Sequence, residues 1–242
     1  MSENSLFISD LHLAPERPEI IKLFTRFVDE VAKDADNLFI LGDFLEYWIG
    51  DDDPAVGLDN VFSALQRLHD TNTRVFMMHG NRDFLMGKKL AKRCGFTLIG
   101  DPYPLNINSQ TALLMHGDLL CSDDIAYQKF RRKARNPIIR ALFKRLPLSV
   151  REKIAMSLRE TSSKETAKKS EYIMDVNQQT VENTMRQFNT SLLIHGHTHR
   201  PGIHEFTLDN QPASRIVLGD WYKHGNYLKL NDNNEFELVQ FS

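Results

Sequence analysis

Five short apolar runs of this chain each lead directly into residues that can bind metals. The residues that follow are histidine, aspartate and asparagine, which supply imidazole, carboxylate and amide ligands. They stand in Asp10-Leu11-His12, Gly42-Asp43, His79-Gly80-Asn81-Arg82-Asp83, His116-Gly117-Asp118 and His195-Gly196-His197-Thr198-His199. The length of the runs is typical of buried strands. Because ligands of open α/β sheets bind at the carboxyl ends of the strands, the pattern predicts one site at that edge of one sheet.

Seven residues form the candidate set of metal ligands: Asp10, His12, Asp43, Asn81, His116, His197 and His199. Carboxylates combined with imidazoles suit Mn, Fe, Zn or Ni rather than calcium. Residues two apart in an extended chain point to the same side, so Asp10 is expected to act with His12, and His197 with His199. Seven ligands are too many for one tetrahedral ion, but they suffice for two ions if one carboxylate bridges them. Two ions about 3.5–4 Å apart can share a hydroxide and hold a phosphoryl group for in-line attack.

Strands and helices alternate through the first half of the chain, which indicates the α/β class. Pro18 fits the first turn of a helix whose apolar stripe runs to Val31. Further helices are expected over 58–69 and 85–93, the latter ended by Gly95. Near the end, segments 215–218, 227–230 and 235–241 are typical of antiparallel strands.

The composition favours one intracellular domain. The chain has 242 residues, is 41% hydrophobic and carries a net charge of −2. Its two cysteines, Cys94 and Cys121, cannot make a disulfide framework, which favours a reducing compartment. The start of the chain lacks the basic region of a signal peptide, and no apolar stretch approaches the ~20 residues of a membrane span. Any membrane contact is therefore expected to be peripheral.

One segment between His116 and His195 differs from the rest, and we interpret residues 125–188 as a helical insertion. Residues 125–170 contain fourteen Lys or Arg and three Glu, a net charge of +11 that leaves −13 for the remainder. An apolar stripe from Ile138 to Leu146 predicts one helix, and a capping box from Ser149 to Glu152 predicts the start of a second. A third is expected from about residue 170.

The order of the motifs resembles the calcineurin-like metallophosphoesterases, a match that runs from residue 10 to 199. The resemblance implies an αββα sandwich of two mixed sheets flanked by helices, with the insertion as a lid. It also implies one ion on Asp10, His12, Asp43 and His199, and another on Asp43, Asn81, His116 and His197, with Asp43 bridging. The Gly-His-x-His pattern selects residues 197 and 199, which leaves His195 open between a supporting and a core role.

Further segments resemble one branch of that family, the UDP-2,3-diacylglucosamine diphosphatases of lipid A synthesis. They are 42–53, 80–85, 121–127, 174–177 and 197–201. The resemblance implies Mn²⁺-dependent hydrolysis of a UDP-linked diacylglucosamine lipid at the cytoplasmic face of the bacterial inner membrane, with Asp43, Arg82 and His197 in the catalytic centre. It implies head-group contacts from Asn81, Arg82, Asp124, Arg159, Ser162, Thr166, Lys169 and His197. Acyl-chain contacts are expected from Trp48, Phe84, Tyr127, Phe130 and Met156.

Arg82 is a departure from the wider family. In many members of that family, a histidine follows the motif asparagine and is proposed to protonate a leaving alkoxide. A phosphate monoester, with a second pKa of about 6, leaves well without a proton. A guanidinium can instead hold phosphate oxygens with two hydrogen bonds. We therefore hypothesise that the substrate is a diphosphate.

Other functions remain open at this point. The same two metals could serve a nucleotide or protein phosphatase. The basic block could bind nucleic acid, although it lacks interleaved aromatic residues for stacking on bases, or it could be a solvated helical face. A metal-free scaffold is a third possibility. Asp83 and Asp118 are expected to orient ligands, and Asp51-Asp52-Asp53 to form a solvated turn.

Overall fold

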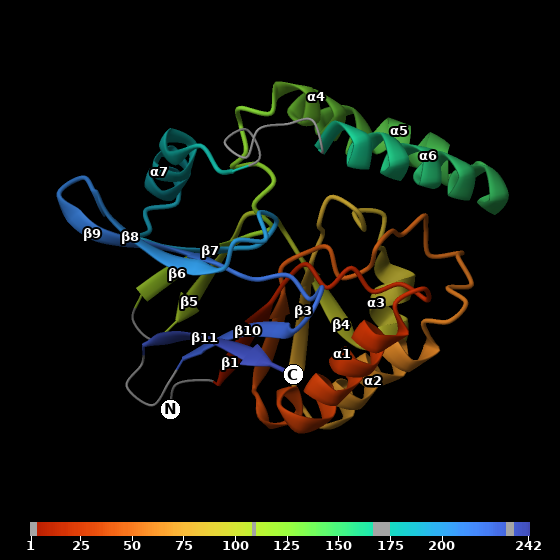
Figure 1. Cartoon of the computed structure of the whole chain (residues 1–242), viewed down its shortest axis with the longest axis horizontal. Helices are drawn as coiled ribbons and strands as arrows, with labels where there is room; N and C mark the ends of the chain where they lie inside the picture. The colour runs from red at the N-terminus through yellow and green to blue at the C-terminus, as the bar shows by residue number, and fades with distance from the viewer. Residues whose placement is uncertain (1–3, 108–109, 167–174, 231–234) are drawn as a thin grey trace.

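The fold consists of two β-sheets packed face to face, with helices on both outer faces (Figure 1). The computed structural model describes residues 4–107, 110–166, 175–230 and 235–242, and side chains at 162–166 lie outside the description. Among the described residues, no helix is long and apolar enough to cross a membrane.

The first sheet has six strands in the order β11-β10-β1-β2-β3-β4. Strands β1 (Ser5–Ile8), β2 (Asn37–Ile40), β3 (Arg74–Met78) and β4 (Phe96–Ile99) are parallel to their neighbours in this series. Strands β10 (Gly225–Leu230) and β11 (Phe236–Phe241) form an antiparallel pair that joins the edge of β1. The connections carry α1 (Pro18–Glu30), the short 3-10 helix η1 (Ala32–Asp34), α2 (Asp59–Asp70) and α3 (Lys88–Cys94).

The second sheet has five strands in the order β5-β6-β7-β9-β8. Strands β6 (Gln110–Met115), β7 (Leu192–His195) and β9 (Gln211–Val217) run parallel. The edge strands β5 (Tyr103–Ile107) and β8 (Gly202–Leu208) run antiparallel to their neighbours. Both sheets are therefore mixed, which confirms the predicted αββα sandwich.

Alternation along the strands builds three core layers, because successive side chains face opposite sides of a sheet. Leu6 and Ile8 of β1 pack toward α1 and α2, whereas Phe7 packs between the sheets. Its ring stacks on Phe39 of β2, with centroids 5.1 Å apart. Beyond the second sheet, Leu113 and Leu193 pack under α7 (Gln178–Gln187). The rigid core thus fixes where each strand ends.

The expectations about the sheets were correct only in part. Segment 215–218 falls at the end of β9, which pairs antiparallel with β8 as expected but parallel with β7, and segments 227–230 and 235–241 fall in the antiparallel pair β10 and β11. The five candidate segments also do not end strands of a single sheet: β1, β2 and β3 belong to the first sheet, and β6 and β7 to the second. They still converge, because these parallel strands of the two packed sheets end at the same side of the sandwich.

Helices α4 (Ile125–Ala134), α5 (Pro137–Lys144) and α6 (Leu148–Thr166) lie together above the strand ends, outside the sandwich (Figure 1). The Ser149 capping box was wrong, since α6 starts one residue earlier and Arg151 N–H donates to the Pro147 carbonyl at 3.1 Å. Helix α7 begins at residue 178, where the Asn177 side chain accepts from Thr180 N–H; the start expected near residue 170 lies outside the described residues. We call α4–α6 the cap helices.

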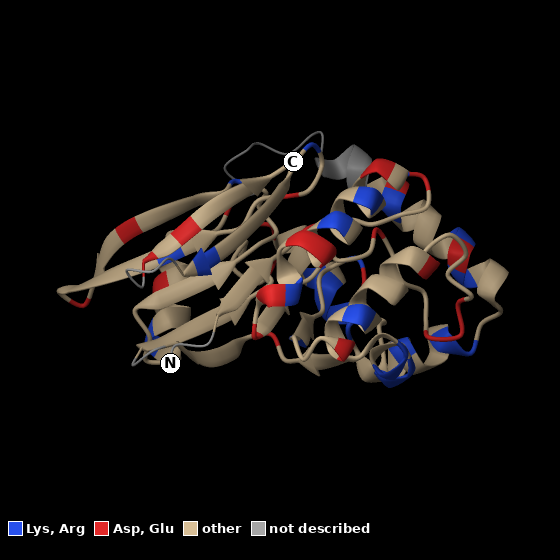
Figure 2. Ribbon diagram, turned by 90° about the horizontal axis from the view of Figure 1, so that it is seen from below, with Lys and Arg blue, Asp and Glu red and all other residues tan. Residues whose placement is uncertain are grey.

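Charges of both signs are interspersed over the helices that cover the first sheet (Figure 2). They form ion pairs such as Arg67–Asp29 (2.9 Å) between α2 and α1, and Arg93–Asp59 (3.2 Å) between α3 and α2. Both cysteines are buried and unpaired, and burial raises the pKa of each thiol to about 12. Neither cysteine therefore offers a reactive thiolate.

Candidate metal centre

Five of the seven candidate ligands adopt a left-handed backbone conformation directly after a strand. The φ angles are 57° at Asp10, 49° at His12, 49° at Asp43, 70° at His197 and 55° at His199. The expected extended geometry was therefore wrong for both pairs, Asp10 with His12 and His197 with His199, although the side chains do point into the same site. Left-handed conformations are unfavourable for residues with a Cβ and concentrate at functional sites, where packing holds them.

One group of ligands comprises Asp10, His12 and His199. Asp10 Oδ1 lies 3.3 Å from His199 Nε2, and His12 Nε2 lies 3.4 Å from the same nitrogen. Asp43 completes the group, with Oδ2 3.8 Å from His12 Nε2. These two ring nitrogens and two carboxylate oxygens thus converge on one point.

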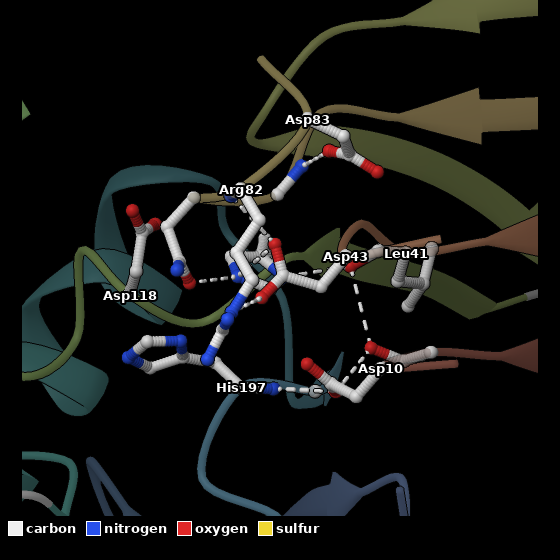
Figure 3. Close-up of polar contacts among 12 residues, drawn as sticks. Asp10, Leu41, Asp43, Arg82, Asp83, Asp118 and His197 are labelled. Carbon is white, nitrogen blue, oxygen red and sulfur yellow. Dashed lines mark hydrogen bonds and ion pairs between the residues drawn. The ribbon is translucent and has the colours of Figure 1, made fainter. Parts of the chain in front are cut away.

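A second group lies on the other side of Asp43 and includes Asp10, Asp43 and His116. Asp43 Oδ1 lies 3.9 Å from His116 Nε2, which is 3.0 Å from Asn81 Oδ1. The ring of His197 packs 5.0 Å from that of His116. Figure 3 shows Asp43 among Asp10, Arg82 and His197. Asp43 therefore directs one oxygen to each group, as a bridging carboxylate would.

The donor set fits divalent metal ions. Asp10 Oδ1 is buried and accepts no hydrogen bond, which is costly for a carboxylate oxygen without a cation. Burial opposes ionisation of Asp10, yet His199, His116 and His12 hold its pKa well below the ordinary value. Burial also opposes protonation of His116, but Asp43, Asp118 and Asp10 raise its pKa to about 9. Because a metal binds only the neutral imidazole, ion binding would release that proton.

Two further buried aspartates brace the loops that carry the ligands. Asp83 accepts from Gly80 N–H at 2.8 Å and from Phe44 N–H at 2.8 Å, so it ties the loop after β3 to the loop after β2. Asp118 accepts from Tyr127 Oη–H and from Arg131 Nε–H, both at 2.6 Å. Burial and the charge of Asp43 raise the pKa of Asp83 to about 6.

His195 is a buried structural residue beside the site. Its Nε2 lies 3.1 Å from Arg215 Nη1, and its Nδ1 lies 2.8 Å from the Gly196 carbonyl. Because arginine can only donate, Nε2 accepts and Nδ1 carries the proton that it donates to Gly196. Burial and Arg215 lower the pKa of His195 to about 3, so the ring is neutral. Its role is to fix the start of the loop that carries His197.

Glu46 is the residue in the site to which the sequence assigned no role. It lies three positions after Asp43, is 5% exposed and points toward the first group of ligands. Its carboxylate contacts Arg82 Nη1 at 2.5 Å and His12 Nδ1 at 3.4 Å. Arg82 also donates its backbone N–H to Asp43 Oδ1 at 2.9 Å. Arg82 is thus fixed beside the bridging carboxylate.

Several arginines of the cap helices point inward to the sandwich instead of forming a solvated face. Arg135 donates to the Gly80 carbonyl at 2.9 Å, and Arg140 donates to the Phe84 carbonyl at 2.8 Å. Arg151, which is 1% exposed, donates to the Ile49 carbonyl at 2.7 Å and pairs with Asp52. Residues 51–53 do form the expected turn, in which Asp53 N–H donates to the Gly50 carbonyl at 3.0 Å and Asp52 is exposed, but Asp51 is only partly exposed and accepts from backbone N–H groups at the start of α3.

The remaining predicted contacts fall into three groups. Arg159 reaches the site and pairs with Glu46, whereas Asp124 caps α4 by accepting from Tyr127 N–H. Trp48 lies in the core at 4% exposed, Phe84 is partly buried, and Phe130 and Met156 are exposed on the cap helices. The side chains of Ser162, Thr166 and Lys169 lie outside the described residues.

The chain belongs to the family described as Calcineurin-like phosphoesterase, whose profile matches residues 4–201. Several curated proteins are nearly half identical in sequence to this chain. A protein named UDP-2,3-diacylglucosamine hydrolase from Edwardsiella ictaluri is 48% identical over 94% of this chain and 88% of its own length. Proteins of that name from Ectopseudomonas mendocina and Proteus mirabilis are each 46% identical over 98% of this chain, and over 97% and 98% of their own lengths. The family and the donor set together identify a divalent-metal site.

Gly80→Ala is expected to damage this site. A Cβ at Gly80 would stand 2.1 Å from Asp43 N, a distance that forces the two ligand loops apart. We expect the variant to fold but to bind Mn²⁺ at least about tenfold more weakly, as measured by isothermal titration calorimetry.

Gly100→Ala is the matched control, because its Cβ would meet only the Pro102 carbonyl oxygen at 3.5 Å. Wild-type Mn²⁺ affinity in Gly80→Ala, with the control also unchanged, would contradict the tight approach of the two loops.

Proposed function

We propose that the protein hydrolyses the diphosphate bond of UDP-2,3-diacylglucosamine, giving UMP and 2,3-diacylglucosamine 1-phosphate. The observation that carries this proposal is Asp43, which directs one oxygen to each ligand group while Arg82 stands against it. The shared name of the relatives, which align over nearly the whole chain, supports the choice of substrate. The reaction belongs to lipid A synthesis.

The proposed metal assignment takes Asp43 as the ligand that both ions would share. Asp10, His12, Asp43 and His199 would hold one divalent ion. Asp43, Asn81, His116 and His197 would hold the other. We propose Mn²⁺, which this mixture of oxygen and nitrogen donors suits. Ions in this site would supply Lewis acidity and an activated water for attack on phosphorus.

The chain's own residues orient the diphosphate. The water oxygen bonds to the α-phosphorus, and the bond from that phosphorus to the bridging oxygen breaks. The leaving sugar phosphate needs no proton, because its second pKa is about 6. Arg82 therefore serves as a phosphate ligand, and its guanidinium can donate two parallel hydrogen bonds to phosphate oxygens. His197 and Asn81 lie on the same side of Asp43 and complete the head-group contacts.

We expect the purified protein to release UMP from UDP-2,3-diacylglucosamine only in the presence of a divalent ion, with Mn²⁺ the most effective. Chelation should abolish turnover, and Asp43→Ala should lower it by at least about a thousandfold, since both ligand groups lose an oxygen. Chromatographic quantification of UMP provides the measurement.

A substrate panel separates this function from its competitors. p-Nitrophenyl phosphate and cyclic nucleotides should be turned over far more slowly than the UDP-lipid. Equal turnover of the simple esters would instead indicate a general phosphatase.

We also propose that the protein acts at the cytoplasmic face of the inner membrane and binds it peripherally through the cap helices. Helix α5 turns apolar side chains to solvent, with Ile138 70% and Leu142 56% exposed. Exposed basic residues lie on or directly after the same cap helices: Arg132, Lys133, Lys144, Arg145 and Lys153. Exposed apolar side chains on strongly basic helices suit the surface of an anionic bilayer.

Vesicle sedimentation tests this location. We expect cosedimentation with phosphatidylglycerol-containing vesicles that weakens as salt is raised. Ile138→Asp with Leu142→Asp should weaken binding by at least about tenfold, because each inserted side chain contributes about 1.5–3 kcal/mol. Val56→Asp is the control, since Val56 is 77% exposed but lies outside the cap helices. Equal loss in the control would contradict docking through α5.

A further inference from the structure

Glu46 connects three parts of the site that come from distant segments of the chain. Its Oε1 lies 2.5 Å from Arg82 Nη1, in the loop after β3, and 2.9 Å from Arg159 Nε on α6. Its Oε2 lies 3.4 Å from His12 Nδ1, in the loop after β1. One buried carboxylate thus meets a metal-ligand histidine, the phosphate arginine and a cap helix.

The contact with His12 acts on the metal-binding nitrogen. His12 Nε2 faces the other ligands, 3.4 Å from His199 Nε2, and the buried Nδ1 faces Glu46 Oε2 at an ion-pair distance of 3.4 Å, without a hydrogen bond to any described residue. A carboxylate at the second ring nitrogen of a metal-bound histidine fixes the tautomer and the ring orientation. Among the described residues, no other carboxylate forms an ion pair with Nδ1 of His12. Removal of the Glu46 charge should therefore weaken metal binding.

The contacts with the two arginines act on phosphate recognition. Arg82 and Arg159 carry like charges, yet both reach the same oxygen of Glu46. Arg159 is 53% exposed, so without an anion between them its side chain would turn to solvent. Glu46 therefore holds two guanidinium groups together beside the metal ligands, where a diphosphate carries its charge.

We propose that Glu46 is a positioning residue that orients His12 and holds Arg82 and Arg159 as a preassembled phosphate-binding pair. Because Arg159 lies on α6, the ion pair that holds α6 against the sandwich also completes the site. This inference rests on the proposed diphosphatase function for its role in turnover, but not for its role in metal binding.

Glu46→Gln tests both roles, because it keeps the shape of the side chain and removes the charge. Mn²⁺ affinity, measured by calorimetry without substrate, should fall about tenfold. In turnover of the UDP-lipid, Glu46→Gln and Arg159→Gln should each lower kcat/KM. The double variant should lose no more kcat/KM than the single variant with the larger loss, because both substitutions break the same ion pair.

Asp52→Asn is the matched control. Asp52 forms another ion pair between α6 and the sandwich, with Arg151, and among the described residues no ion pair joins it to a metal ligand. We expect the Mn²⁺ affinity of Asp52→Asn to stay within threefold of wild type. In the double variant of Asp52→Asn and Glu46→Gln, the two fold-losses in kcat/KM should multiply. Should Glu46→Gln not fold, Glu46→Asp keeps the buried charge but withdraws it from all three partners, and it carries the same test.

Unchanged Mn²⁺ affinity together with multiplicative effects of Glu46→Gln and Arg159→Gln would overturn the proposal. Failure of the wild type to cleave the UDP-lipid would overturn the proposed function instead. The calorimetric comparison of Glu46→Gln with Asp52→Asn would still decide whether Glu46 positions His12.

Discussion

The structure depends on the burial of negative charge where the strands of two sheets end together. Asp10, Asp43, Asp83 and Asp118 are each no more than 2% exposed, and Glu46 is 5% exposed. An ionised carboxylate in such a place is strongly unfavourable unless a cation or several hydrogen bonds compensate it. Many of the surrounding residues supply those compensating partners.

Each carboxylate is compensated differently. Asp83 accepts backbone N–H groups and has a raised pKa. Asp118 binds Arg131 of α4, and Glu46 binds Arg82 and Arg159. Asp10 and Asp43 face mainly imidazoles, a setting in which bound divalent ions would supply the compensating charge. The acidic sandwich and the basic cap helices are thus complementary halves of one site.

The cap helices therefore have two distinct faces. Arg131, Arg135, Arg140 and Arg151 bind inward to side chains and carbonyl groups of the sandwich. Ile138 and Leu142 point outward. This arrangement inverts the usual amphipathic helix, whose apolar stripe covers the core. The proposed lipid substrate and membrane surface would give a physical reason for the inversion.

The sequence predicted the five strand ends, because short apolar runs followed by polar ligands are a local pattern. It did not predict β5 or β8, whose residues at the sheet edges are mostly exposed or partly buried and form no apolar run. The division of the site between two sheets also escaped prediction, since strand pairing is not encoded in any one segment. The inward role of Arg151 depends on Asp52, 99 positions away, and Glu46 contacts Arg82 across 36 positions. Such long-range ion pairs leave no local signal.

The central claim is that Asp43 bridges two metal ions. Electron paramagnetic resonance of the protein titrated with Mn²⁺ tests it most directly, because ions that share a carboxylate are magnetically coupled. We predict that the second equivalent replaces the hyperfine spectrum of isolated Mn²⁺ with that of a spin-coupled pair, and that Asp43→Asn abolishes the coupling. Two bound ions that retain the spectrum of isolated Mn²⁺ would contradict the account.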